Sequence, residues 1–163
     1  MMEFADSTIL SSWHVTQVLE TGKWSTLDKI DVDKQNIIAG PYNINNNHWL
    51  AFIIDIIRLE FFLLDPKNHS PSILDKCFQS WCKYYNFRNV KQDIEWTVRK
   101  IKHPLQQDHF NCGVFVIKLT KNYILNDIVE ENINFDCSSK SLECDRQLIS
   151  SAIENYKEKW FFN

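Results

Sequence analysis

The sequence predicts an α+β domain in which helices flank a central, mostly antiparallel sheet. Three extended runs follow one another closely in the first half of the chain, and helical patterns stand before and after them. The run from Trp49 to Ile54 is almost continuously apolar, which is typical of a central strand covered on both faces. Because 163 residues make about one ordinary domain, we expect a single domain over residues 1–163.

The first half of the chain predicts one helix followed by three strands. Residues 7–21 favour the helix, with Asp6 or Ser7 as its cap and Gly22 directly after its end. Turns are expected at Gly40-Pro41, in the Asn-rich stretch and over residues 56–58. The strands are expected at residues 36–38, 48–55 and 59–64.

The second half predicts three more helices and one more strand. Ser70-Pro71 gives a cap and a proline at the first helical position, and residues 94–101 alternate as in a strand with one wet face. Residues 112–125 read as a largely apolar buried helix. The amphipathic helix after Ser70-Pro71 is indicated by Leu74, Cys77, Phe78, Trp81 and Tyr85, and the closing helix by Leu142, Ile149, Ala152, Ile153 and Tyr156.

Composition excludes several classes of protein. The net charge is -3 and the basic residues are scattered, so we expect no nucleic-acid partner. The most apolar stretch, Trp49 to Ile57, is interrupted by Asp55 and is too short to span a membrane, so no membrane partner is expected. Five cysteines and no signal-peptide pattern indicate a reducing, intracellular location, nucleus or cytoplasm.

The cysteines and histidines outside the motifs below form no metal site by their spacing, so no metal or other cofactor is expected. We expect these cysteines to be structural and these histidines to be surface or internally satisfied residues. They are Cys77, Cys82, Cys137, Cys144, His14, His69, His103 and His109.

The segment from Gln106 to Gly113 carries the candidate chemistry. Cys112 opens the apolar helix, where the helix dipole and the free amides of the first turn favour a thiolate, so it is a candidate nucleophile. Gly113 leaves room for a substrate carbonyl, and the amides of Cys112 and Gln106 can stabilise an oxyanion. Gln107 takes the role of Gln106 if the loop is shifted by one residue, and Asp108 is a candidate to cap or brace the loop.

A base and its orienting carboxylate stand in the strand region. His48 opens one strand and Asp65 closes the next, so a hairpin brings the imidazole and the carboxylate together. His48 then takes the thiol proton from Cys112 and returns it to the leaving amine. Asp55 is a competing carboxylate, but the hairpin register favours Asp65.

This pattern resembles the Ulp/sentrin-protease family of cysteine peptidases: His48-Trp49, an Asp seventeen residues after the His, and a Gln six residues before Cys112-Gly113. The resemblance covers roughly residues 30–125. It implies a papain-like core with a Cys-His-Asp triad of Cys112, His48 and Asp65, and with Gln106 at the oxyanion. It also implies that Trp49 covers a channel for the Gly-Gly tail of a ubiquitin-like modifier, with SUMO-type modifiers favoured as partners.

One feature usual in that family has no match in the sequence. Members carry a Trp-Leu-Asn-Asp segment well before the His-Trp pair, so we expect a chain that is N-terminally shortened or divergent. Two alternatives to peptide-bond cleavage follow from the same reading. One is an acetyltransferase effector of the same fold, and the other is a modifier-binding module with little turnover.

Overall fold

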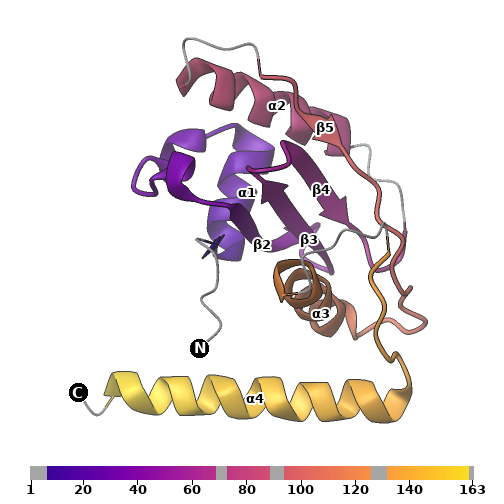
Figure 1. The fold of residues 1–163 in the computed structure, drawn as a ribbon. Helices are drawn as coiled ribbons and strands as arrows, with labels where there is room; N and C mark the ends of the chain where they lie inside the picture. Colours follow the sequence, from indigo (N-terminus) through magenta and orange to yellow (C-terminus); the bar gives the residue numbers. More distant parts are fainter. Residues whose placement is uncertain (1–6, 69–72, 89–93, 126–131, 162–163) are drawn as a thin grey trace.

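The computed structural model describes residues 7–68, 73–88, 94–125 and 132–161 (Figure 1). Two short 3-10 turns, Trp24–Leu27 and Val32–Lys34, connect the first helix to the sheet. The other elements, in chain order, are β1 (Ser7–Ile9), α1 (Ser12–Thr21), β2 (Ile37–Ile44), β3 (His48–Asp55), β4 (Glu60–Leu64), α2 (Ile73–Arg88), β5 (Thr97–Val98), α3 (Cys112–Leu125) and α4 (Ser139–Phe161).

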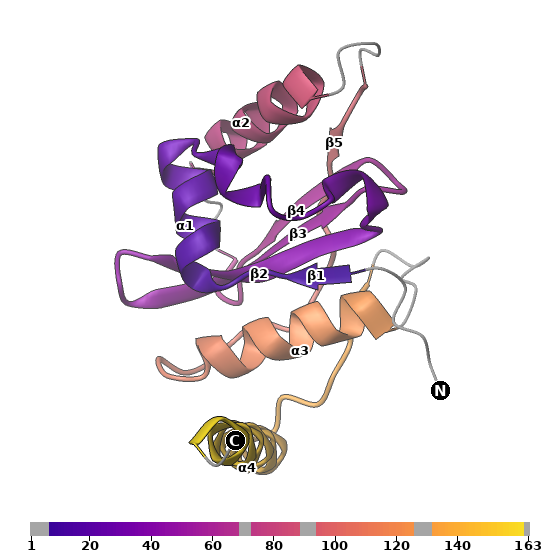
Figure 2. The ribbon, with the colours of Figure 1, turned by 90° about the vertical axis from the view of Figure 1, so that its left-hand side faces the viewer.

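The five strands form one sheet in the order β1-β2-β3-β4-β5. The inner pairs β2–β3 and β3–β4 are antiparallel, and the short edge strands pair in parallel. Helices α1 and α2 cover one face of the sheet, and α3 covers the other (Figure 2). β3 is central and buried from Leu50 to its end, so the expected α+β class and the central strand are both confirmed.

The first helix begins later than the sequence pattern predicts. Ser7–Ile9 form β1, which pairs with the start of β2, and the helix begins at Ser12. Its cap is therefore Ser11, whose side chain accepts a hydrogen bond from the amide of His14, and not Asp6 or Ser7. Pairing with a distant strand outweighs the local helical pattern. The expected end is correct, because Gly22 adopts the left-handed conformation at φ 67°.

The turn expected at Gly40-Pro41 is wrong, since both residues lie within β2. Gly40 is needed for close packing: a Cβ there would lie 2.7 Å from Val15 Cγ2 and 2.8 Å from the carbonyl oxygen of Leu10. β1 pairs only with the first three residues of β2, so Pro41 lies beyond it, where β2 has an open edge. The chain turns instead at the asparagines, where Asn45 and Asn46 have positive φ.

The later elements largely follow the expectations. α2 buries Cys77, Trp81 and Tyr85, while the Ser70-Pro71 cap lies outside the described residues. The strand expected over residues 94–101 is only Thr97–Val98, because its neighbour β4 offers two paired positions before the chain leaves the sheet. α3 has the predicted bounds.

The closing helix is present as α4, which lies on the side of α3 that faces away from the sheet (Figures 1 and 2). Leu142 packs against Val114 and Phe115 of α3. Farther along α4, Leu148 and Ile153 are 64% and 52% exposed, so its apolar face is only partly covered. Within the described part of the chain, no helix has the length and apolar character needed to cross a bilayer.

Candidate active site

The structure joins His48 to Asp65. His48 is the first residue of β3 and Asp65 directly follows β4, so the antiparallel pairing places both at one end of the sheet. His48 Nε2 lies 2.7 Å from Asp65 Oδ1, and the two side chains are 12% and 6% exposed. Because a carboxylate can only accept, Nε2 carries the proton. The amide of Lys67 donates to the same oxygen at 2.7 Å and helps to orient the carboxylate.

Asp55, the competing carboxylate, lies at the opposite end of β3. It accepts hydrogen bonds from the Arg58 backbone amide and guanidinium, both at 2.8 Å, and from the Tyr123 hydroxyl at 2.9 Å. Burial and the adjacent carboxylate hold the pKa of Tyr123 above its ordinary value, so the hydroxyl keeps its proton. Asp55 therefore fastens the β3–β4 turn to the C-terminal part of α3, away from His48.

Cys112 is the first residue of α3 and is 8% exposed. The helix is held under the sheet by Val116 and Leu119, which pack in one cluster with Ala51 and Ile53 of β3. Figure 2 shows the N-terminal end of α3 and the β2–β3 hairpin at the same end of the sheet. The fold thus brings Cys112 to the end where His48 and Asp65 meet, at a helix terminus that favours a thiolate.

Gly113 leaves open space beside Cys112. A Cβ built on Gly113 would find no heavy atom within 4 Å, so a side chain is absent where the fold itself does not require it to be. This differs from Gly40, where a Cβ would meet a backbone oxygen. The space is compatible with the close approach of a substrate backbone.

Gln106 is buried and is tied to the strand end that carries Asp65. Its backbone amide donates to the carbonyl of Pro66 at 2.8 Å, while Gln107 is exposed. The Gln106 side chain donates from Nε2 to the backbone carbonyl and to Oδ1 of Asp108, both at 2.9 Å. Its Oε1 is buried and accepts no hydrogen bond from the described residues. The amide expected at the oxyanion therefore lies on Asp108 in this structure.

Asp108 braces the loop of residues 106–111, hereafter the nucleophile loop. Besides Gln106, it accepts hydrogen bonds from the amides of Phe110 and Asn111 at 2.9 and 2.8 Å, and from Asn111 Nδ2 at 2.5 Å. Burial opposes ionisation, but these donors together hold the pKa of Asp108 well below its ordinary value. The carboxylate is therefore charged across the neutral range.

Arg146 of α4 also reaches this loop, a contact that the sequence did not indicate. Its Nε donates to Asn111 Oδ1 at 2.8 Å, and its Nη2 to the Phe110 carbonyl at 3.2 Å. The two segments are 35 residues apart and belong to different elements, so no spacing rule connects them. Only the composition of the loop, with Asp108 and Asn111 ahead of the cysteine, was a signal of local bracing.

Trp49 is half-buried and packs at the margin of the cluster between the sheet and α3. Its neighbour His48 points to the opposite face of β3, as alternate residues of a strand do. The packing of Trp49 is consistent with a core residue at the rim of the site.

The remaining cysteines and histidines make no site among the described residues, where no group of three or more possible metal ligands occurs. Cys77 is fully buried, as expected for a structural residue, whereas Cys144 is exposed on α4. His14 contacts Ser11, His103 contacts the Pro104 carbonyl, and His109 is exposed. His69 lies outside the described residues.

An α+β core with a cysteine at a helix N-terminus, and a His–Asp pair at the same end of the sheet, is the layout of a papain-like cysteine peptidase domain. Residues 10–159 match the model of the Ulp1 protease family, C-terminal catalytic domain, so the chain belongs to this family. The match extends beyond the expected residues 30–125 in both directions and includes α1 and most of α4.

Individual relatives agree with this membership. The chain is 23% identical over 118 residues to Ubiquitin-like-specific protease 1 of Saccharomyces cerevisiae, which covers 68% of the chain and 19% of the relative. The chain thus spans about a fifth of that protein.

Solved structures share the fold. A structure of the SUMO protease Ulp1 with its catalytic cysteine oxidised to a sulfenic acid has a TM-score of 0.69 at 20% identity, covering 88% of this chain and 66% of that one. The Ulp1 protease domain in complex with Smt3, the yeast ortholog of SUMO, has a TM-score of 0.65 at 20% identity, with coverages of 78% and 61%. The Xanthomonas campestris effector XopD bound to ubiquitin gives 0.60 at 11% identity, with coverages of 86% and 76%.

Proposed function

We propose that the protein is a cysteine protease that cleaves peptide or isopeptide bonds after the C-terminal Gly-Gly of a ubiquitin-like modifier. Cys112 is the nucleophile, His48 the base and Asp65 the orienting carboxylate. The observation that carries the proposal is the buried His48–Asp65 pair at 2.7 Å, at the end of the sheet where α3 begins with Cys112. Membership of the Ulp1 protease family supports the same chemistry.

The hydrogen bond to Asp65 determines which ring nitrogen of His48 acts. Nε2 donates to the carboxylate, so Nδ1 is the nitrogen that takes the proton from the Cys112 thiol. The thiolate attacks the carbonyl carbon after the terminal glycine, and the protonated imidazole then gives its proton to the leaving amine. This produces a thioester on Cys112, which a water molecule activated by His48 hydrolyses. The carboxylate of Asp65 stabilises the imidazolium formed in each half of the reaction.

The oxyanion formed during attack is stabilised by the Cys112 amide and by Gln106. A backbone amide in the first turn of a helix is not used by the helix itself and is available to the substrate. For Gln106 to donate, Nε2 exchanges one of its two acceptors on Asp108 for the substrate oxygen. The other bond to Asp108 keeps the amide in place during this exchange.

A modifier ending in glycines fits the open space beside Gly113, because a substrate without side chains lets the two backbones approach closely. Trp49 covers the tail in this proposal. A SUMO-type modifier is favoured because the relatives include SUMO proteases and a Smt3 complex, while the ubiquitin-bound effector makes ubiquitin the alternative. All five cysteines are free, which supports a reducing compartment, nucleus or cytoplasm.

The test is labelling by vinyl-sulfone probes made from a panel of modifiers, ubiquitin and SUMO-type included. The wild-type chain should form an adduct with at least one probe and cleave the matching coumarin-linked substrate. Cys112→Ala should lose both, while Cys144→Ala, at an exposed cysteine on α4, should keep both. An adduct retained by Cys112→Ala would remove this cysteine as nucleophile. Binding without cleavage by the wild type would instead identify a modifier-binding module.

A further inference from the structure

Arg146 makes three contacts with the backbone and side chains that directly precede Cys112. It donates to Asn111 Oδ1 and to the Phe110 carbonyl, and its guanidinium lies 4.9 Å from the centre of the Phe110 ring. Such a planar fork is suited to hold two acceptors and an aromatic face at the same time. We infer that Arg146 is a positioning residue, through which α4 sets the geometry of the nucleophile loop.

The contact is passed on to the proposed oxyanion donor through side chains. Asn111 accepts from Arg146 with Oδ1 and donates to Asp108 with Nδ2, so both ends of its amide are fixed. Asp108 in turn accepts from Nε2 of Gln106. A continuous chain of hydrogen bonds therefore runs from Arg146 to Gln106. When Arg146 is lost, Asn111 loses the partner that orients its amide, and Asp108 loses the constraint that this amide supplies.

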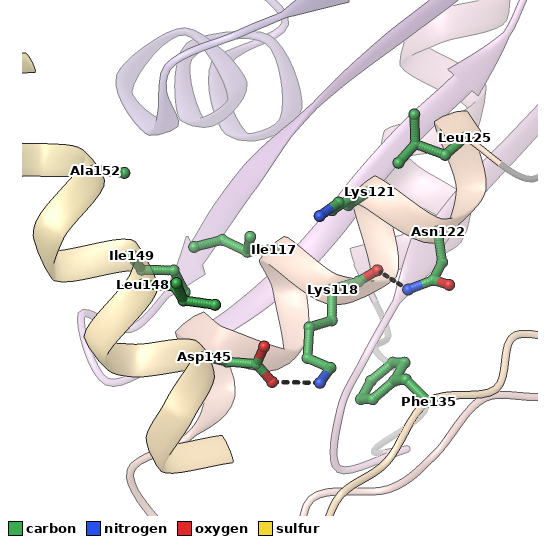
Figure 3. Close-up of a pocket in the computed structure, with 10 residues that line it drawn as sticks. All are labelled: Ile117, Lys118, Lys121, Asn122, Leu125, Phe135, Asp145, Leu148, Ile149 and Ala152. Atoms are coloured by element: carbon green, nitrogen blue, oxygen red, sulfur yellow. Dashed lines mark hydrogen bonds and ion pairs between the residues drawn. The ribbon is translucent and has the colours of Figure 1, made fainter. Parts of the chain in front are cut away.

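The same turn of α4 is anchored to α3. Asp145, the neighbour of Arg146, forms an ion pair with Lys118, whose ammonium also lies 4.9 Å from the centre of the Phe135 ring. Figure 3 shows this pair at one end of the groove of about 460 Å³ between the two helices. Adjacent residues of α4 thus bind the nucleophile helix and the loop before it. Because Leu148 farther along α4 is largely exposed, this turn is a principal attachment of the helix.

This inference rests on the proposed function and deepens it, because it adds a distant residue that supports the oxyanion donor. It predicts a selective defect. Acylation by a Gly-Gly substrate develops an oxyanion and depends on Gln106, whereas alkylation of Cys112 by iodoacetamide develops none. Arg146→Ala should slow single-turnover acylation about 10- to 10²-fold, as expected for a misplaced catalytic group. The rate of Cys112 alkylation, and its dependence on pH, should stay unchanged.

Three variants separate positioning from a general loss of stability. Arg146→Lys keeps the charge but loses the fork, so it should restore acylation only in part. Gln147→Ala, at the adjacent exposed residue of α4, should behave as the wild type. In the double variant Gln106→Ala plus Arg146→Ala, the second change should add little, since both act through one donor. Additive effects, or an equal fall in alkylation, would overturn the inference.

Hydrogen exchange gives a readout that needs no turnover. In the full chain, Arg146→Ala should speed exchange of the Phe110 and Asn111 amides, which Asp108 holds, and leave the amides of β3 unchanged. Unchanged exchange at both loop amides would contradict the positioning role even if no modifier is cleaved. Loss of the proposed function is therefore distinguishable from failure of this inference.

Discussion

His48 donates from Nε2 to Asp65 Oδ1 across 2.7 Å, and both side chains are largely shielded from water. The pair crosses from the start of β3 to the residue just after β4, so the β3–β4 hairpin alone is sufficient to form it. A short, shielded hydrogen bond of this kind holds an imidazole in one tautomer and one orientation. The ring nitrogen that faces away from Asp65 is then available for proton transfer.

Replacing Asp65 by asparagine tests that relationship. An amide can donate as well as accept, so Asp65→Asn allows the wrong tautomer and no longer stabilises the imidazolium. We expect kcat/KM for a coumarin-linked modifier to fall by roughly 10² to 10⁴. Asp31→Asn, at an exposed ion pair with Lys34, is the control and should have no effect. Wild-type activity in Asp65→Asn would show that another group orients His48.

The two adjacent glutamines offer a test of the loop register. Gln106 is buried and bound to Asp108, whereas Gln107 is exposed and donates to the Leu105 carbonyl at 3.2 Å. We expect Gln106→Ala to slow acylation roughly 10²- to 10³-fold in single-turnover measurements, as is typical for one oxyanion donor. Gln107→Ala should acylate at the wild-type rate. The reverse order of the two effects would move the donor role to Gln107.

Two glycines should respond to alanine in opposite ways. At Gly40 a Cβ would meet Leu10 and Val15 closer than 3 Å, so Gly40→Ala should lower the free energy of unfolding by about 1–3 kcal/mol. At Gly113 a Cβ enters open space, so Gly113→Ala should keep its stability. Its kcat/KM should nevertheless fall, because the methyl group occupies space proposed for the substrate. Urea unfolding and steady-state kinetics measure the two quantities, and a fully active Gly113→Ala would place the substrate elsewhere.

The network at the far end of β3 should affect stability and leave chemistry intact. Tyr123→Phe removes the 2.9 Å hydrogen bond to the buried Asp55, which keeps its bonds to Arg58. We expect the free energy of unfolding to fall by about 1–2 kcal/mol, read from the urea midpoint at constant m-value. The kcat/KM of the folded enzyme should be unchanged. A catalytic defect without loss of stability would contradict the purely structural role of Asp55.

Cysteine reactivity should separate Cys77 from Cys144. Burial raises the pKa of Cys77 from 9.0 to about 12, whereas Cys144 is exposed on α4. In Cys112→Ala at pH 8, iodoacetamide should therefore modify Cys144 and spare Cys77, as peptide mass spectrometry can measure. Because the folded pKa of Cys77 lies above the unfolded value, its stabilising contribution is present below pH 9 and is lost as the pH rises towards 12. Rapid labelling of Cys77 in the native protein would contradict its burial.

The parts of the fold that the sequence predicted correctly are those with strong local periodicity. The apolar run of β3 and the helix beginning at Cys112 have the expected bounds, because side-chain burial imposes the pattern directly. Errors fall where a distant neighbour decides. Ser7–Ile9 became a strand through pairing with β2, and Gly40 lies in a strand because α1 packs on it. Neither neighbour is visible in a local window.

For the candidate site, the sequence by itself determined the identities and order of His48, Asp65, Gln106 and Cys112, since residue type and spacing carry that chemistry. Only the tertiary structure decided their partners. Strand register joined His48 to Asp65 and left Asp55 at the other end, and the folded loop placed the Gln106 amide on Asp108. The docking of α4 brought Arg146 to this loop from 35 residues away. Contacts of this kind depend on how elements pack in space, and no periodicity along the chain records them.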